Sequence, residues 1–270
     1  GLADLGNVYS DGALSNRNLV INGAMQVAQR GASVSGYSSA STYATCDRME
    51  VNVNNLGAYT VTQEADAPEG FSNSLKLDCS TSDASPASTD YVFVAHKIEG
   101  QNVQHLKKGT ADALPVTLSF WVKSNMTGTY QFNARDNDNV RYISASYTIN
   151  AADTWEYKTL LIAGDTIGAF DNDANESLKV EWWLDSGSNF DSGTLNTSWT
   201  AANNINRNAA STVSIGGSTS NYWQITGVQL EVGDTATSFE HRSYGEEISL
   251  CQRYYFEPTD LQSTNRYCIW

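Results

Sequence analysis

The sequence has little positive charge. It carries 16 Lys and Arg residues against 30 Asp and Glu, which gives a formal net charge of −14 at pH 7. Proteins that bind nucleic acids neutralise phosphates with a basic surface, and anionic membrane surfaces attract basic segments for the same reason. The charge balance therefore argues against nucleic-acid binding and against an anionic membrane as a partner.

Long apolar runs are also lacking. No stretch approaches the roughly 18 apolar residues of a membrane-spanning helix, and the N-terminus does not have the pattern of a signal peptide. We therefore expect no membrane insertion. The chain begins at Gly1 rather than Met, which suggests a processed or excised segment of a longer protein.

Cysteine is scarce and has no metal-binding spacing. The four cysteines, Cys46, Cys79, Cys251 and Cys268, form no C-x-x-C pair, so a zinc site is not expected. A core of this size needs no covalent cross-links, which favours reduced thiols; one or two disulfides are the alternative.

Familiar catalytic motifs are missing too. The sequence has no G-x-S-x-G elbow, no phosphate-binding loop and no H-E-x-x-H, and its three histidines are far apart. We therefore predict no enzymatic activity and no cofactor. A polysaccharide-degrading enzyme that uses acids such as Glu181 and Asp185 is the remaining catalytic alternative.

Alternating apolar and polar residues dominate what is present. Such alternation is typical of sheets with one buried face, and Gly, Asn, Asp and Ser clusters separate the segments. The predicted strands are 47–53, 58–64, 74–79, 90–98, 114–124, 129–135, 140–149, 155–163, 178–185, 211–215 and 222–232. So many strands with little helix predict an all-β fold, an antiparallel β-sandwich or barrel.

The chain divides into three parts on this basis. Residues 1–17 are polar and aperiodic and are predicted to be a lead-in coil, 18–232 form the β domain, and 233–270 form a C-terminal extension. The extension contains a short predicted helix over 243–254, because Ser243 can cap it and Glu246 follows three residues later. The extension either begins a further domain or packs back on the fold.

The segment 18–31, NLVINGAMQVAQRG, allows two interpretations. The Asn22-Gly23 pair between apolar runs is a hairpin signal. The second arm is short, however, so a single strand that bends at Gly23 and serves both sheets is the preferred interpretation.

Four segments carry a resemblance to a known family. They are NLVINGAMQVAQRG (18–31), LPVTLSFWVKSNMTGTYQF (114–132), NAADTWEYKTLLIAGDT (150–166) and YWQITGVQLEVGDTATSFEHRSYGEEISLCQRYY (222–255). In order and spacing they resemble a domain of marine bacteriophage tail-fibre proteins. The same order of strands is similar to jelly-roll carbohydrate-binding modules.

The resemblance implies a jelly-roll β-sandwich in the virion. Such a domain is expected to lie far from the tail, to form a homotrimer with other virion fibre proteins nearby, and to meet a host cell-surface glycan. Assembly in the host cytoplasm fits reduced thiols. Many jelly-roll sugar modules hold a structural calcium with an acidic pair in the closing strand. Residues 225–228 (ITGV) have no carboxylate there, so we expect no metal at that position.

Strand alternation nominates the residues that would touch a sugar. Pyranose rings stack on flat aromatic faces, and amides and carboxylates bind their hydroxyls. Trp121 shares a polar strand face with Lys123, and Trp183 shares one with Glu181 and Asp185. The two indoles are the predicted stacking platform.

Polar residues on neighbouring strands complete the predicted site. Gln131, Arg135 and Tyr142 are further candidate contacts, and Trp199 lies in the long polar stretch 186–221 that is expected to reach a ligand or to anchor its own loop. The alternative for both strand indoles is burial under a loop or a neighbouring subunit, and one bulge would exchange the two faces of a strand.

The sequence thus predicts a non-catalytic adhesion module of a phage tail fibre that binds a host glycan. A purely structural fibre or capsid module that contacts only other subunits is the first alternative. A polysaccharide-degrading tail enzyme is the second.

Overall fold

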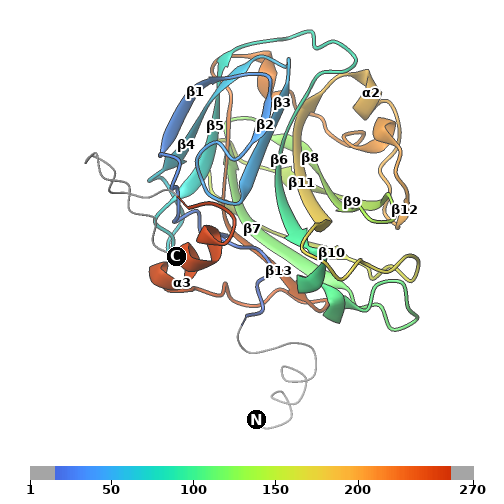
Figure 1. Ribbon diagram of the computed structural model, residues 1–270. Helices are drawn as coiled ribbons and strands as arrows, with labels where there is room; N and C mark the ends of the chain where they lie inside the picture. Colours follow the sequence, from blue (N-terminus) through green and yellow to red (C-terminus); the bar gives the residue numbers. More distant parts are fainter. Residues whose placement is uncertain (1–15, 257–270) are drawn as a thin grey trace, which may run out of the picture.

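Two antiparallel sheets form the protein, whose computed structural model describes residues 16–256 (Figure 1). The first sheet has six strands in the order β1-β4-β5-β13-β7-β10, and the second has seven in the order β12-β9-β8-β11-β6-β3-β2. The strands are β1 (Ser33–Tyr37), β2 (Ala40–Thr42), β3 (Met49–Asn54), β4 (Ala58–Glu64), β5 (Ser74–Thr81), β6 (Tyr91–Glu99), β7 (Val116–Ser124), β8 (Gly128–Asp136), β9 (Arg141–Ile149), β10 (Glu156–Ile162), β11 (Glu176–Ser186), β12 (Thr200–Ala201) and β13 (Tyr222–Val232). The fold is an antiparallel β-sandwich of jelly-roll type, as the sequence predicted.

Alternation located most of the strands. The prediction over 58–64 matches β4, and that over 222–232 matches β13. The predicted strand over 211–215 is wrong, because this stretch is irregular and leads into the 3-10 turn η4 (Ile215–Gly217). The short strands β1, β2 and β12 were not predicted, since they are polar and too brief to show a period.

Large apolar side chains fill the space between the sheets. Trp182 of β11 packs edge-on against Phe120 of the opposite sheet and against Phe132 of β8, with ring centroids 5.9 and 5.5 Å apart. Trp182, Trp223 and Tyr130 are completely buried. Burial of each such aromatic contributes on the order of 2–3 kcal/mol, so this core stabilises the packing of the two sheets.

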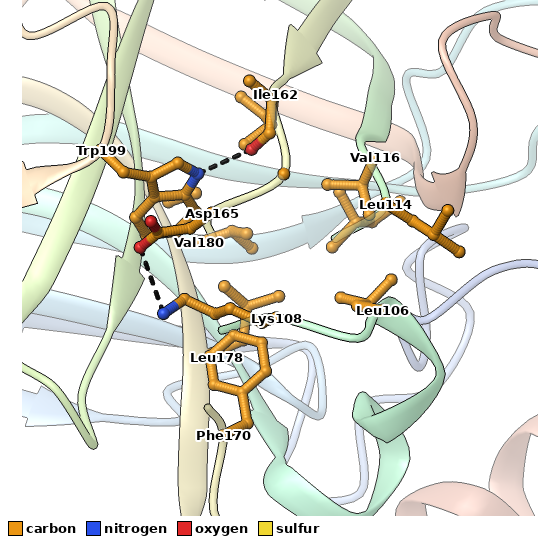
Figure 2. A pocket seen from close by; sticks show the side chains of 14 residues that line it. Leu106, Lys108, Leu114, Val116, Ile162, Asp165, Phe170, Leu178, Val180 and Trp199 are labelled. Atoms are coloured by element: carbon orange, nitrogen blue, oxygen red, sulfur yellow. Dashed lines mark hydrogen bonds and ion pairs between the residues drawn. The ribbon is translucent and has the colours of Figure 1, made fainter. Parts of the chain in front are cut away.

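A buried lysine stabilises one region between the sheets (Figure 2). Lys108 has a side chain that is only 4% exposed, and its Nζ lies 2.5 Å from Asp136 Oδ2 and 3.2 Å from Asp165 Oδ2. It also donates to the carbonyls of Ile167 and Gly168. Arg141 binds Asp165 as well, at 2.7 Å. These contacts satisfy an ammonium group that would otherwise be costly to bury.

The segment 18–31 contains neither a hairpin nor a strand. The amide of Leu19 donates to Leu230 of β13, a turn follows at Asn22, and the carbonyl of Val27 accepts from Asp47, just before β3. The segment therefore passes from one sheet to the other, as the bent-strand interpretation required, but without ladder pairing. Gly23 is needed because a Cβ at this position would lie 2.1 Å from the carbonyl oxygen of Val228.

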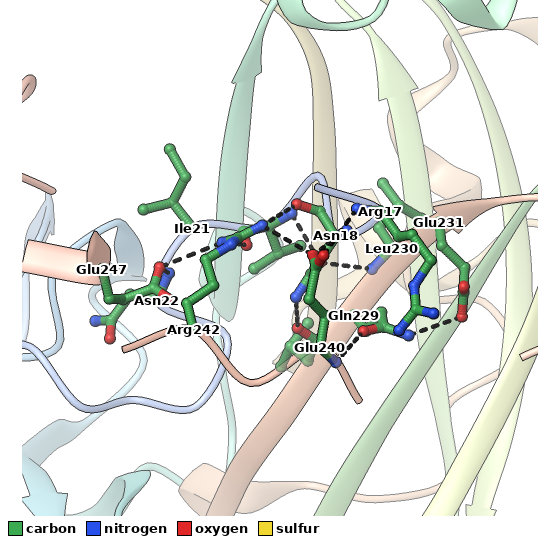
Figure 3. A network of polar contacts seen from close by, with 12 residues as sticks. Arg17, Asn18, Ile21, Asn22, Gln229, Leu230, Glu231, Glu240, Arg242 and Glu247 are labelled. Carbon is green, nitrogen blue, oxygen red and sulfur yellow. Dashed lines mark hydrogen bonds and ion pairs between the residues drawn. The ribbon is translucent and has the colours of Figure 1, made fainter. Parts of the chain in front are cut away.

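A polar network joins this entry segment to the C-terminal part of the chain (Figure 3). Arg242 donates to the carbonyl of Asn18 at 2.5 Å, and Glu240 accepts from the amide of Asn18 at 2.9 Å. Glu247 accepts from the amide of Asn22 at 2.5 Å. Residues 240–247 thus pack back on the sandwich, which was one of the two alternatives for the extension.

The predicted C-terminal helix is present as α3 (Tyr244–Gln252). Ser243 caps it by accepting from the amide of Glu246 at 3.3 Å. The stretch 101–109 forms two single 3-10 turns, η1 (Gly100–Asn102) and η2 (Gln104–Leu106). Within residues 16–256, no helix is long and apolar enough to cross a membrane.

The thiols of Cys46, Cys79 and Cys251 are free and buried, whereas Cys268 lies outside the described residues. Among those residues, no group of three His, Cys, Asp or Glu side chains is arranged to hold a metal ion. The predicted lead-in coil lies almost wholly before residue 16 and is likewise outside the described part.

Candidate functional site: an aromatic strip on the six-stranded sheet

The two predicted stacking indoles lie on opposite sides of the sandwich. Trp121 belongs to β7 in the six-stranded sheet, and Trp183 belongs to β11 in the seven-stranded sheet. Both side chains point away from the core. They therefore face in opposite directions, and the prediction of one shared platform is wrong.

Trp183 is covered by its own chain. Its indole is fully buried, stacks on Phe93 at 4.7 Å between ring centroids, and contacts Phe190 of the short helix α2 (Ser188–Asp191) at 5.4 Å. The prediction of an exposed Trp183 is wrong, because the long connection after β11 folds back over this sheet. The packing alternative describes this indole.

Gln131 and Glu181 hold that connection in place. Gln131 donates to the carbonyl of Asn206 at 2.7 Å, and both oxygens of Glu181 accept from Arg207. Burial alone would raise the pKa of Glu181, but Arg207, Lys179 and the indole of Trp183 lower it to about 2. Both side chains are fully buried and already paired, so in this structure their polar atoms serve the loop.

Asp185 points into the sandwich rather than out of it. A bulge separates Trp183, which pairs with Phe93, from Asp185, which pairs with the inward-facing Val92. The bulge exchanges the faces, and the prediction that Asp185 lies beside Glu181 is therefore wrong. Because the two acids leave opposite faces of β11, they do not form the carboxylate pair that a glycosidase needs.

Asp185 is instead part of the support for η4. Its Oδ2 accepts from the Ser214 hydroxyl at 2.6 Å and from the amide of Gly216 at 2.9 Å. Burial raises the pKa of its carboxyl to about 6, although these hydrogen bonds oppose the increase.

Trp199 anchors its loop. Its indole Nε1 donates to the carbonyl of Ala163 at 2.6 Å, and its ring covers the Lys108 ammonium at 5.4 Å from the centroid (Figure 2). It lines a mainly apolar cavity together with Phe170 and Leu114, and Lys108 and Asp165 also border this cavity. This matches the anchoring alternative, and the indole remains half-buried.

Trp121 lies in an aromatic environment that sequence reasoning missed. Its ring is 5.3 Å from that of Tyr157, the residue paired with it on β10. Tyr157 is 45% exposed, and Trp121 itself is partly exposed. β10 buries Leu160 and Ile162 and leaves Tyr157 and Leu161 on its outer face.

A second group of rings continues the surface on the other side of Trp121. Phe71 packs against Phe239 and His241, with centroids 5.0 and 5.4 Å apart. A Cβ on Gly227 would lie 2.7 Å from Phe71 and 3.0 Å from Trp121, so both rings pack closely against this glycine. We call this surface the aromatic strip; its members are Tyr157, Trp121, Phe71, Phe239 and His241.

Charged groups border the strip. Lys123, two residues beyond Trp121 on the same face of β7, binds Asp66 at 2.6 Å. Asp66 also accepts from the indole Nε1 of Trp155 at 3.3 Å, and the Lys123 ammonium lies 5.9 Å from the Trp155 ring. Burial opposes ionisation of Asp66, but Lys123 and Trp155 lower the pKa of its carboxyl below the ordinary value. Aromatic faces and an ionised carboxylate thus lie side by side at the surface.

No family model matches the sequence, and no curated protein matches it. Similar solved structures include a putative sugar binding protein from Bacteroides thetaiotaomicron, with 13% identity over 80% of this chain and 100% of that one and a TM-score of 0.44. TmCBM61 in complex with β-1,4-galactotriose has 8% identity over 81% of this chain and 100% of that one, with a TM-score of 0.40.

A third likeness is the enzymatically active domain of tailspike protein 4 from Bacteriophage CBA120. It has 14% identity and a TM-score of 0.40, and the match covers 80% of this chain but only 21% of the tailspike chain. With TM-scores below 0.5, these likenesses carry no argument about function, and the fold assignment follows from the strand pairing of the chain itself.

Proposed function

We propose that this protein is a non-catalytic glycan-binding module of a phage tail fibre, and that the aromatic strip holds the sugar. The observation that carries the proposal is the pair Trp121 and Tyr157, whose rings lie together on an outer sheet face next to Asp66 and Lys123. The sequence resemblance to tail-fibre domains supports the virion location.

The chemistry of the strip suits a pyranose. Partly exposed rings offer apolar faces for sugar C–H groups, while a carboxylate and an ammonium can bind the hydroxyls. The rings are attached to paired strands, so little conformational entropy is lost when a ligand binds. Single-site affinity is expected to be weak. Presentation of three copies in a homotrimer would raise the avidity for a host surface without new contacts.

One observation favours the structural alternative. Leu161 lies on the edge strand β10, on the same face as Tyr157, and its side chain is 56% exposed. An exposed apolar side chain on an edge strand is suited to burial against another subunit. In this reading the strip would be covered by a fibre protein rather than by a sugar.

Host-cell adsorption and a glycan array test the proposal with two matched variants. Tyr157→Ala removes a ring of the strip, and Tyr244→Ala removes a similarly exposed ring (57% against 45%) at the start of α3, where alanine suits the helix. We expect Tyr157→Ala and Trp121→Ala to weaken glycan binding at least tenfold and Tyr244→Ala to leave it unchanged. Equal binding by all variants would reject the strip as the site. Loss of oligomerisation in Tyr157→Ala, with no glycan bound by the wild type, would support the structural alternative.

A further inference from the structure

The opposite face of the sandwich has a hollow that faces solvent beside the connection 186–212. It lies between the outer face of β8, β9 and β11 and the residues around η3 (Asn204–Asn206). It is lined by Asn133, Arg135, Tyr142, Glu181, Ala202, Asn203, Asn204 and Arg207. Its volume, including the open mouth, is about 240 Å³.

Arg135 brings an unpaired charge to this hollow. Its side chain makes no hydrogen bond or ion pair with any other residue of the described range, and its Nε is buried without a partner. Arg135 pairs in register with Lys179, and Lys179 pairs with Lys97, so three cations lie side by side across the sheet. Like charges directly opposite each other repel, and such a row needs counter-ions.

Within the described part of the chain, carboxylates lie close to the two lysines but not to Arg135. Lys97 lies 3.0 Å from Glu50 and Lys179 lies 3.5 Å from Glu181. Glu181 is also bound by Arg207 at 2.8 Å. Among residues 16–256, no carboxylate forms an ion pair with Arg135.

Two of the polar side chains in the wall are already occupied. The side-chain oxygen of Asn133 accepts from Gln131 and Ser144, and the hydroxyl of Tyr142 donates to the carbonyl of Asn203 while accepting from Asn196. The guanidinium of Arg135, by contrast, has no partner among the described residues and can bind a ligand. A guanidinium presents two parallel N–H donors that match a carboxylate.

We propose that this hollow binds the carboxylate of an acidic sugar, a uronate unit of an anionic glycan, through Arg135. The ligand class rests on the proposed function, but the place does not, since the aromatic strip lies on the other sheet. The carboxylate enters the hollow and pairs with Arg135, while the sugar ring remains at its mouth. The module then recognises a neutral ring face on one side and an acidic unit on the other.

Binding of paired oligosaccharides tests this. The probes are trimers of galacturonate, glucuronate, mannuronate and guluronate, each with its carboxyl-reduced neutral derivative, followed by calorimetry or NMR titration. We expect at least one acidic trimer to bind tenfold or more tightly than its neutral partner. Arg135→Gln is expected to reduce that ratio to about one, and Arg135→Lys to keep only part of it.

Controls separate this site from the strip. Lys76→Gln removes a cation from the opposite sheet and should leave the ratio unchanged, and Trp121→Ala should lower the affinity for neutral sugars but not the preference for the acid. The melting temperature should not fall in Arg135→Gln, because the side chain has no partner to lose among the described residues and its charge adjoins Lys179. No preference for any acid, or a preference that survives Arg135→Gln, overturns the proposal. If sugar binding depends on Trp121 alone, the proposed function stands and the hollow is rejected as a binding site. If binding of the acidic sugar depends on Arg135 alone, the aromatic strip is rejected as a binding site and the hollow is retained.

Discussion

The guanidinium of Arg207 lies 4.5 Å from the ring centroid of Trp183, and its Nη2 binds Glu181 at 2.8 Å. One residue of the covering loop thus binds both the indole and the buried carboxylate of β11. The loop is therefore part of the stable structure of the seven-stranded sheet, and its removal would expose a large aromatic surface.

Breaking this pair should destabilise the fold strongly. Arg207→Met leaves the fully buried Glu181 with only Lys179 and the Trp183 indole, and loss of one partner of a buried ion pair costs about 3–5 kcal/mol. We expect a fall of that size in the free energy of unfolding, measured by urea denaturation. The double variant with Glu181→Gln should lose less than the sum of the two single changes, by about 1–3 kcal/mol. Strict additivity would show that the two residues are not coupled.

Lys108 should be equally sensitive to substitution. Its ammonium binds Asp136 and Asp165, and Lys108→Met would leave the fully buried Asp136 without its counter-ion. We expect a loss of about 3–5 kcal/mol in the free energy of unfolding.

Lys107→Met is the matched control for this change. It removes the neighbouring but exposed ammonium, and its effect should stay within about 0.5 kcal/mol. If the two variants unfold at the same denaturant concentration, the buried cluster contributes nothing measurable.

The sequence was sufficient to predict the two sheets but not the loop that covers the seven-stranded sheet. Alternation located β4, where burial alternates along the strand. It also located β13, although nearly every residue of that strand is buried on both faces. The same alternation predicted that the Trp183 side chain points away from the core, and in the structure it does lie on the outer face of β11. Its burial depends on Phe190 and Arg207, which are distant in sequence and reach it only through tertiary folding.

Two further errors have local causes. The faces of β11 are exchanged at the bulge before Asp185, and a bulge has no distinct composition here. In β10, Leu160, Leu161 and Ile162 are consecutive apolar residues, so either phase of the strand satisfies the pattern. The sequence therefore located Trp121 but missed Tyr157 beside it, although this pair is the centre of the proposed site.

The buried Asp185 carboxyl should make stability fall as the pH rises. Its pKa is about 6 in the folded protein and 3.8 as the unperturbed reference value, so the folded state binds the proton more tightly. The resulting stabilisation is fully present below pH 4 and is lost as the pH rises through about 6. Two pKa units correspond to about 3 kcal/mol.

Asp185→Asn isolates this contribution from other titrating groups. Glu181, whose pKa is lowered to about 2, acts in the opposite direction at acid pH in both proteins. The difference in unfolding free energy, wild type minus Asp185→Asn, should therefore decline between pH 4 and pH 7 and then level off. A difference independent of pH would contradict a raised pKa at this carboxyl.

Gly227 should control the geometry of the aromatic strip. Its φ of +61° favours glycine, and an added Cβ would lie 2.7 Å from Phe71 and 3.0 Å from Trp121. Gly227→Ala therefore combines backbone strain with a collision between the two rings, whereas Gly70→Ala, at φ +91° with no atom within 4 Å of the added Cβ, has strain alone. We expect Gly70→Ala to cost about 1–2 kcal/mol of unfolding free energy and Gly227→Ala about 1–3 kcal/mol more. Because the collision displaces Trp121, only Gly227→Ala should also weaken glycan binding. If both changes had equal effects on stability and on binding, the two rings would not meet at this glycine.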